Sequence, residues 1–386
     1  MSNSTAFDFY LTEEQRLVRK SAEDFARDAI LPLARKIDRE HYFPKELIPQ
    51  LGALGFMGVT APQDYGGAGL DSVSYALIIE ELAKACASTS VIVSAHNSLC
   101  LWPILTYGTD AQKNKYLPRL ASGEWIGCFA LSEPGTGSDA ARQTCSAKRT
   151  GKTWFIQGVK NWITNAPAAA VCVLFTMEKP ELGHKGINAF IIELKTTSGV
   201  SIGKLEDKLG ICGSPTASIS FENVEVDEDQ LLGTPGEGFK IAMSTLDGGR
   251  IGIAAQAAGI AGAALEDSLV YAKQRSSFGK LIAEHQSIQN YLADMSIAID
   301  AARFLTLAAA RRKDAGIPHT REAAQAKLFA SETAVACALK GIQIHGGYGY
   351  VKEFNVERYL RDAKITEIYE GTSEIQRLVI AGQLLK

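Results

Sequence analysis

The stretch CFALSEPGTGSD, residues 128–139, lies where the character of the sequence changes from helical to β. From about Gly123 onward, short runs rich in β-branched and aromatic residues alternate with clusters of Gly, Pro, Asn and Ser. This pattern is typical of strands joined by turns. The clearest predicted strands are residues 154–156, 171–176, 189–194 and 218–226.

Helical segments flank this β region on both sides. On the amino-terminal side, Thr12 and Gln15 form a capping box, and apolar residues recur at helical spacing from Ser72 to about Ala87. On the carboxyl-terminal side, the lengths of the expected helices suit an antiparallel bundle with short connections. These helices run roughly over residues 239–274, 285–313 and 321–344, with a shorter one near the end.

The chain length supports division into domains. At 386 residues the chain exceeds one ordinary hydrophobic core, so two or three domains are expected. We assign an α+β multidomain fold, with a helical domain over residues 1–122, a β domain over residues 123–236 and a helical bundle over residues 237–386.

Composition excludes several classes of protein. A net charge of −3 gives no field that would hold nucleic acid, and no run of about 18 apolar residues predicts a membrane span. The amino terminus lacks the pattern of a secretory signal. Seven cysteines without a C-x-x-C motif fit reduced thiols in a cytoplasm or an organelle matrix.

Short catalytic motifs are present but lie in the wrong context. GTGSDA, residues 135–140, matches the relaxed dinucleotide fingerprint, yet no long amphipathic helix follows it. GVSIG, residues 199–203, matches the nucleophile elbow, but the residues after it indicate an exposed connection rather than a helix. No Walker A motif, H-E-x-x-H motif or zinc-type Cys/His spacing occurs, so no metal site is predicted.

Longer segments carry a resemblance that covers nearly the whole chain. Residues 128–139 are followed by NWITN, and RDAKITEIYEGTSEIQR occupies residues 361–377. Between them lie QRSSFG at 274–279, HQ at 285–286 and QIHGG at 343–347. Together these segments resemble the signatures of the acyl-CoA dehydrogenases, most closely the short-chain (butyryl-CoA) branch. The resemblance implies a barrel-like middle domain and a carboxyl-terminal four-helix bundle.

The resemblance further implies non-covalently bound FAD and a homotetramer built as a dimer of dimers. Some residues would contact the flavin from within the subunit, and others would reach the ADP portion across a subunit interface. The first group is Phe129, Leu131, Ser132, Gly137, Ser138, Trp162, Ile163 and Thr164, with Thr372 and Glu374 completing the site. The second group is Arg275, Phe278, Gln286, Gln343, Gly346 and Gly347.

Glu370 matches the catalytic base of the family, which removes the α-proton of the acyl thioester while the β-hydride passes to flavin N5. An apolar site should raise the pKa of Glu370 and suit it to this role. In the isovaleryl-CoA branch the base lies instead at the position of Gly249, which cannot act as one. Without the surrounding motif, we would interpret Glu370 as an ordinary solvated carboxylate.

Substrate contacts are implied at Ser138, Asp247, Arg250 and Gly371. Asp247 and Arg250 lie three apart on one helical face, so a surface ion pair is the alternative. Residues 85–112 contain no Lys or Arg, which favours an uncharged acyl tail over a distal carboxylate. A short straight chain is expected, and a branched or cyclic acyl group stays open.

The expected electron acceptor is an electron-transferring flavoprotein. An acyl-CoA oxidase that reduces oxygen is the enzymatic alternative, and a nucleic-acid-binding or scaffold role for a family member is disfavoured by the near-neutral charge and by Glu370. The expected compartment is a bacterial cytoplasm, or a mitochondrial matrix if a transit peptide has been removed.

Overall fold

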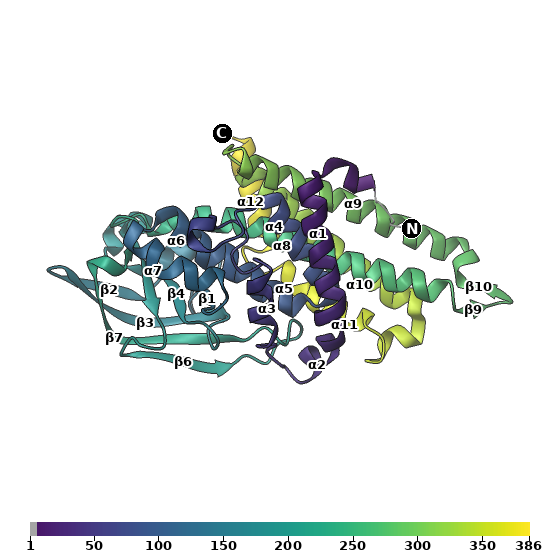
Figure 1. Ribbon diagram of the computed structural model, residues 1–386, viewed down its shortest axis with the longest axis horizontal. Coiled ribbons are helices and arrows are strands. Elements are labelled where there is room, and N and C mark those ends of the chain that lie inside the picture. Colours follow the sequence, from purple (N-terminus) through teal and green to yellow (C-terminus); the bar gives the residue numbers. More distant parts are fainter. Residues whose placement is uncertain (1–5) are drawn as a thin grey trace.

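The computed structural model describes residues 6–386, and its elements follow the predicted order of helices, strands and helices (Figure 1). The capping box is confirmed, since the Gln15 N–H donates to the Thr12 Oγ1 at 3.2 Å and the Thr12 N–H donates to the Gln15 Oε1 at 3.0 Å. The helix predicted to end near Ala87 ends at Ala85, because Cys86 is extended and a new helix starts after it. The helices of this part are α1 Glu13–Phe25, α2 Ala34–Arg39, α3 Leu47–Ala53, α4 Ser72–Ala85, α5 Ala87–Ser94, α6 Trp102–Tyr107 and α7 Asp110–Ala121.

The strands form one mixed sheet in the middle of the sequence. Its path is β6-β7-β3-β2-β4-β5-β8, with β1 pairing parallel to β4. The two outer strands of this path, β6 and β8, do not pair with each other within residues 6–386, so the barrel-like domain that we expected is an open sheet. The strands are β1 Gly127–Ala130, β2 Ser146–Thr150, β3 Thr153–Thr164, β4 Val171–Met177, β5 Ile187–Glu193, β6 Val200–Leu205, β7 Thr216–Asp227 and β8 Leu231–Leu232.

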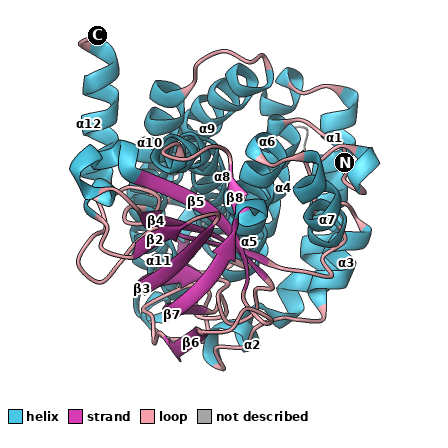
Figure 2. Cartoon of the chain, turned by 90° about the vertical axis from the view of Figure 1, so that its left-hand side faces the viewer, coloured by secondary structure: helices cyan, strands magenta, loops and turns pink. Residues whose placement is uncertain are grey.

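Strand β4 explains why this sheet sits inside the molecule. All seven of its residues are buried, and they alternate between two apolar clusters, with Val173 and Phe175 in one and Cys172 and Leu174 in the other. A strand covered on both faces reads as a continuous apolar run rather than as an alternating one. Helices pack around the sheet in Figure 2.

The carboxyl-terminal part is built around α8. Residues 248–264 of this helix are all buried, as expected for a helix that is apolar on every side. It packs against α4, α9, α10 and α11, and small residues allow close approach: a Cβ on Gly259 would lie 2.3 Å from the Glu80 carbonyl oxygen of α4. The elements are α8 Gly238–Ala272, β9 Ser276–Ser277, β10 Lys280–Leu281, α9 Gln286–Asp314, α10 Thr320–His345, α11 Val356–Thr366 and α12 Ser373–Leu384.

The structure confirms the rejection of both short motifs. The glycine-rich residues 135–140 lead only into a three-residue 3₁₀ turn at Ala140–Arg142. Four of the five residues of GVSIG lie in strand β6, and Gly199 directly precedes it, so the motif does not sit between a strand and a helix. All seven cysteines are free and buried. Across residues 6–386, no helix has the length and apolar character of a membrane span, and no cluster of His, Cys, Asp or Glu could hold a metal ion.

A buried charged network fixes the loop that follows β1. Lys160 of β3 has no exposed surface, and its Nζ donates to the Leu131 carbonyl at 3.0 Å, the Glu133 Oε1 at 2.8 Å and the Gln143 Oε1 at 3.0 Å. Glu133 also accepts the backbone N–H and the hydroxyl of Thr144. Each member therefore has partners, which is the condition under which a buried ion pair is tolerated.

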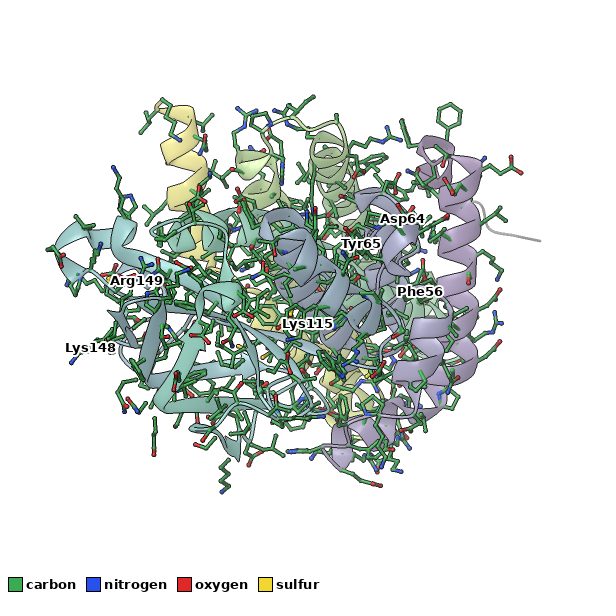
Figure 3. The ribbon with its side chains drawn as sticks, turned by 60° about the vertical axis from the view of Figure 1, so that its left-hand side comes forward. Phe56, Asp64, Tyr65, Lys115, Lys148 and Arg149 are labelled. Atoms are coloured by element: carbon green, nitrogen blue, oxygen red, sulfur yellow. The ribbon has the colours of Figure 1, made fainter. Side chains whose placement is uncertain are left out.

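Replacing Lys160→Met should lower the melting temperature strongly, because it leaves the Glu133 carboxylate buried without its counter-charge. The expected cost is about 3–5 kcal/mol, measured by thermal or urea unfolding. Lys148→Met is the matched control, since Lys148 of the neighbouring strand β2 is exposed and points outward in Figure 3. The double variant Lys160→Met/Glu133→Gln should recover part of the loss. Equal stability of the two single variants would contradict the prediction.

Candidate active site

Glu370 lies in the short loop between α11 and α12. Its backbone is left-handed with φ 53°, and the next residue, Gly371, is also left-handed with φ 94°. The Oε2 of Glu370 is buried and accepts no hydrogen bond. Burial raises the pKa of Glu370 to about 7, while the charges of Lys327 and Arg250 oppose this rise. A half-buried glutamate with one buried, unpartnered oxygen and such a pKa has the properties of a general base.

Two glycines of α8 make room around this carboxylate. A Cβ on Gly249 would lie 2.0 Å from the Glu370 Oε2 and 3.0 Å from the Leu99 side chain. One turn further on, a Cβ on Gly252 would lie 2.3 Å from the Tyr75 hydroxyl. The helix thus approaches Glu370 and Tyr75 so closely that a larger side chain at either glycine would make these neighbours shift. Gly249 is therefore not only unable to act as a base, but any side chain there would also require the Glu370 carboxylate to move.

Asp247 and Arg250 form an ion pair at 2.6 Å on the same helix, as their spacing predicts. Arg250 is only 5% exposed, so the alternative of an ordinary surface pair is wrong. Thr320 of α10 donates its hydroxyl to the other Asp247 oxygen at 2.6 Å, and the Arg250 Nε is buried without a partner. The pair is held in place beside Glu370 and keeps one donor free.

The residues predicted to meet the flavin from the strand side begin at the end of β1. Phe129 lies within β1 and is partly exposed, whereas Leu131 is buried. Ser132 is partly exposed, and Gly137 and Ser138 are exposed in the following loop. A Cβ on Gly137 would meet open space, so this loop borders solvent or a ligand rather than protein.

Trp162 is the most informative residue of this group. The pairing of β3 with β7 shifts register between Lys160 and Ile163, and such a bulge redirects a side chain. Trp162 is left-handed with φ 62° and 59% exposed, while Ile163 is buried in the sheet and Thr164 is partly exposed. An exposed indole on a strained bulge offers a flat apolar face to a ring system.

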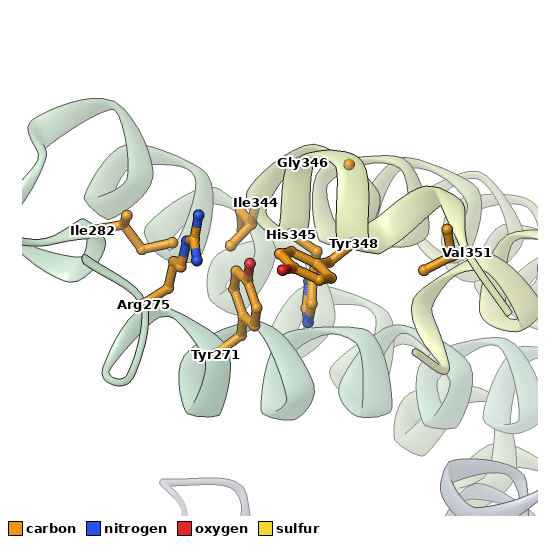
Figure 4. A pocket seen from close by; sticks show the side chains of 9 residues that line it. Tyr271, Arg275, Ile282, Ile344, His345, Gly346, Tyr348 and Val351 are labelled. Carbon is orange, nitrogen blue, oxygen red and sulfur yellow. The ribbon is translucent and has the colours of Figure 1, made fainter. Parts of the chain in front are cut away.

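Half of the second group of predicted cofactor residues lies at an open pocket of about 500 Å³ (Figure 4). Arg275, Gly346 and Gly347 line this pocket together with Tyr271 and Tyr348. The Arg275 guanidinium lies 5.6 Å from the centre of the Tyr348 ring. A guanidinium beside aromatic rings and bare glycine backbone provides what an adenosine diphosphate group needs: charge, stacking surface and close approach.

The remaining predicted residues do not line this pocket. Phe278 is 97% exposed at the tip of the β9–β10 hairpin, and Gln286 and Gln343 are exposed at the start of α9 and near the end of α10. Thr372 caps α12, because its hydroxyl accepts the Ile375 N–H at 3.3 Å, and Glu374 is exposed in the first turn of that helix.

The β9–β10 hairpin, with Phe278 at its tip, projects away from the strand domain. Figure 1 places the β9–β10 hairpin at one end of the long axis and the strand domain toward the other.

Three family models match consecutive parts of the chain: the acyl-CoA dehydrogenase amino-terminal domain over residues 12–124, the middle domain over 128–224 and the carboxyl-terminal domain over 236–385. The chain belongs to the acyl-CoA dehydrogenase family. The recognition made from the sequence motifs is thereby confirmed.

Individual relatives of this acyl-CoA dehydrogenase agree with the short-chain branch. The short-chain specific acyl-CoA dehydrogenase, mitochondrial, of Bos taurus is 51% identical over 376 residues, which cover 97% of this chain and 91% of that protein. The butyryl-CoA dehydrogenase of Megasphaera elsdenii superposes with a TM-score of 0.95 at 46% identity, covering 97% of this chain and 99% of the other.

A further solved structure has a bearing on electron transfer. A chain in a structure described as "Electron transferring flavoprotein of Acidaminococcus fermentans: Towards a mechanism of flavin-based electron bifurcation" superposes with a TM-score of 0.96 at 45% identity. The match covers 97% of this chain and 99% of the other.

Sequence reasoning missed several residues that surround the base. Lys327 donates to the Gly371 carbonyl at 2.7 Å, and the Gln376 side chain donates to the carbonyls of Glu370 at 3.2 Å and of Gly371 at 2.8 Å. The Tyr369 hydroxyl donates to Gln256 of α8. The available signal for Lys327 was a lone lysine within the alanine-rich run of residues 323–327.

Gly249→Ala should displace the Glu370 carboxylate, because the added methyl would overlap the Oε2. The expected result is a dehydrogenase activity lower by about a hundredfold, since a misplacement of about 1 Å at a reacting group has that effect. Gly262→Ala on the same helix is the control, as its Cβ would make only ordinary contacts at 3.5 Å. A crystal structure and turnover of both variants check this prediction, which an active Gly249→Ala enzyme with an unmoved carboxylate would refute.

Proposed function

We propose that this protein catalyses the FAD-dependent α,β-dehydrogenation of a short-chain acyl-CoA to the trans-2-enoyl-CoA, with Glu370 removing the α-proton. The observation that carries the proposal is the Glu370 carboxylate itself, buried, without a hydrogen bond at Oε2 and seated against Gly249 of α8. Family membership supplies the reaction class, and the geometry supports the base. The close relatives named for short-chain substrates support the acyl length.

The residues present fit an FAD. The exposed Trp162 on its bulge suits the isoalloxazine ring, and the pocket at Arg275, Gly346 and Gly347 suits the diphosphate end. FAD supplies the acceptor, at its N5 position, for the hydride that leaves the β-carbon. We infer that subunits share each cofactor in a homotetramer, which is supported by the projecting β9–β10 hairpin, whose tip residue Phe278 is 97% exposed.

The proton transfer depends on the surroundings of Glu370. Burial disfavours its charged form, so the carboxylate gains basicity relative to an exposed glutamate, while the charges of Lys327 and Arg250 keep the ionised form accessible near neutral pH. The positive charge of Arg250 is partly balanced by Asp247. Exclusion of water by substrate should strengthen both effects.

An uncharged short acyl tail is supported by the wall of the site. Leu99 lies beside the position where Gly249 faces Glu370, and the Tyr75 hydroxyl is bonded to Ser94 at 2.8 Å rather than left free for a charged group. No Lys or Arg occurs between Ala85 and Gln112. These features favour a butyryl group over a substrate with a distal carboxylate.

Electrons should pass to an electron-transferring flavoprotein. The likeness to a chain in the Acidaminococcus fermentans structure supports this partner over oxygen. Peroxide formation during turnover would indicate an acyl-CoA oxidase instead. The seven free, buried cysteines support a reducing compartment, either a bacterial cytoplasm or a mitochondrial matrix.

Anaerobic titration of the purified holoenzyme with butyryl-CoA should bleach the visible flavin band. In Glu370→Gln the band should persist although FAD and the thioester still bind, because the amide cannot accept the α-proton. Glu225→Gln is the control, as Glu225 is exposed on strand β7. Bleaching of the Glu370→Gln enzyme would remove Glu370 from the mechanism, and a protein that never retains FAD would remove the proposed function.

The pH dependence of kcat/KM should show one acidic limb centred near pH 7. The pKa of Glu370 in the folded enzyme is raised to about 7, and only the ionised form accepts a proton, so activity should rise with pH up to that value.

The raised pKa of Glu370 also affects the stability of the fold. A carboxyl group with a raised folded pKa stabilises the fold below pH 4.5, and this contribution is lost as pH rises through 7.

Glu370→Gln should therefore melt at a higher temperature than wild type at pH 8 and show a smaller difference at pH 5. Differential scanning calorimetry at the two pH values measures this. The reverse order at pH 8 would indicate that Glu370 is not held in a site that disfavours its charge.

A further inference from the structure

Lys327 is a buried lysine, and burying its ammonium group costs free energy. It lies within α10, it has no exposed surface, and its Nζ donates to the neutral carbonyl of Gly371 at 2.7 Å. Burial lowers the pKa of Lys327 to about 8, opposed most by the negative charge of Glu370. A methionine would fill similar space without the cost of burying an ammonium group. The retained charge therefore points to a function at the neighbouring loop.

That loop has a backbone that needs support from outside. Glu370 is left-handed although it carries a side chain, and Gly371 follows in the same region, so the two peptide groups form a tight turn. Their carbonyls are held by two side chains: Gln376 from α12 donates to both, and Lys327 from α10 donates to the second. This turn decides that the Glu370 carboxylate faces Gly249.

Lys327 is also the principal positive charge acting on the base. Of the two cations that favour the ionised form of Glu370, Lys327 has the larger effect on its pKa, and Arg250 of α8 is already paired with Asp247. The other charges near Lys327 are the carboxylates of Glu367, at the end of α11, and Glu374 of α12. Among the described residues 6–386, Lys327 is thus the one cation that contacts the turn and also acts on its carboxylate.

We propose that Lys327 is a positioning residue for the reaction: it holds the Glu370–Gly371 turn through the Gly371 carbonyl and places a positive charge beside the Glu370 carboxylate. The proposal rests on the proposed function, in which Glu370 is the base. Lys327 itself acts through Glu370 and is not assigned a contact with the substrate.

Two substitutions separate the hydrogen bond from the charge. Lys327→Gln keeps an N–H donor but removes the charge, and Lys327→Met removes both. Removing an opposite charge from a partly buried carboxylate should move the acidic limb of kcat/KM upward by about one pH unit or more in both variants. The Met variant should in addition lose kcat, because the turn is no longer held, and Gln should recover part of that loss.

Lys340→Met is the matched control on the same helix, since Lys340 pairs with Asp294 at 2.9 Å on the outside of the molecule. FAD absorbance and melting temperature confirm that each variant is folded holoenzyme. A pH profile unchanged from wild type in Lys327→Gln would overturn the role of the charge. A kcat equal to wild type in Lys327→Met would overturn the role of the turn. If Lys327→Met does not fold, the Gln variant alone decides.

A second readout does not depend on turnover. The infrared carboxyl band that disappears in Glu370→Gln reports the titration of Glu370 directly, and its midpoint should move upward in Lys327→Gln but not in Lys340→Met. If wild-type enzyme shows this band but is not reduced by any acyl-CoA, the proposed function fails while the action of Lys327 on Glu370 is still measured. A midpoint that stays in place refutes the proposal even in an active enzyme.

Discussion

The contact between one carboxylate and the backbone of one helix organises this molecule. Glu370 becomes a stronger base when its carboxylate is removed from water, but it must still be able to ionise. Both conditions are met if an apolar surface packs closely against the carboxylate and positive charge lies nearby. Gly249 of α8 provides this surface so close to the carboxylate that a Cβ there would lie 2.0 Å from the Glu370 Oε2. Lys327 and Arg250 provide the charge.

The surrounding helices and the sheet hold the residues of this contact in place. Helix α8 is buried along most of its length, and this fixes its glycine-rich face against the amino-terminal helices and against the loop that carries Glu370. The sheet, through the network at Lys160, holds the loop that leads from β1 toward the proposed flavin face. Rigid elements therefore present residues from all three parts of the chain, which is how a site keeps reacting groups within small tolerances.

Local signals in the sequence predicted most of the fold, because they are the causes of the elements they mark. The capping box at Thr12 and the apolar runs of the strands act over a few residues, so they could be read directly. The open sheet could not be read in this way, because closure depends on pairing between distant strands. The break at Cys86 was missed for a similar reason, since helical periodicity continues across it.

In the candidate site, too, the residues marked by a sequence motif or by local spacing were predicted, and those that meet only through folding were not. Glu370 was found because it sits in a long motif, and the Asp247–Arg250 pair because its partners are neighbours on one helix. Lys327 meets Glu370 only through folding, 43 positions along the chain, so no spacing rule exposes it. Trp162 was predicted from the family resemblance. Its exposure depends on a register shift between β3 and β7, which the sequence does not indicate.

The bare backbone at Gly249 also bears on how such enzymes can diverge. Position 249 matches the one that carries the base in the isovaleryl-CoA branch, and a Cβ there would lie 2.0 Å from the Glu370 Oε2, so a side chain at this position requires the Glu370 carboxylate to move. A base gained on the helix would therefore change the placement of the carboxylate in the loop at once, so the two positions are coupled in any change of where the base is carried.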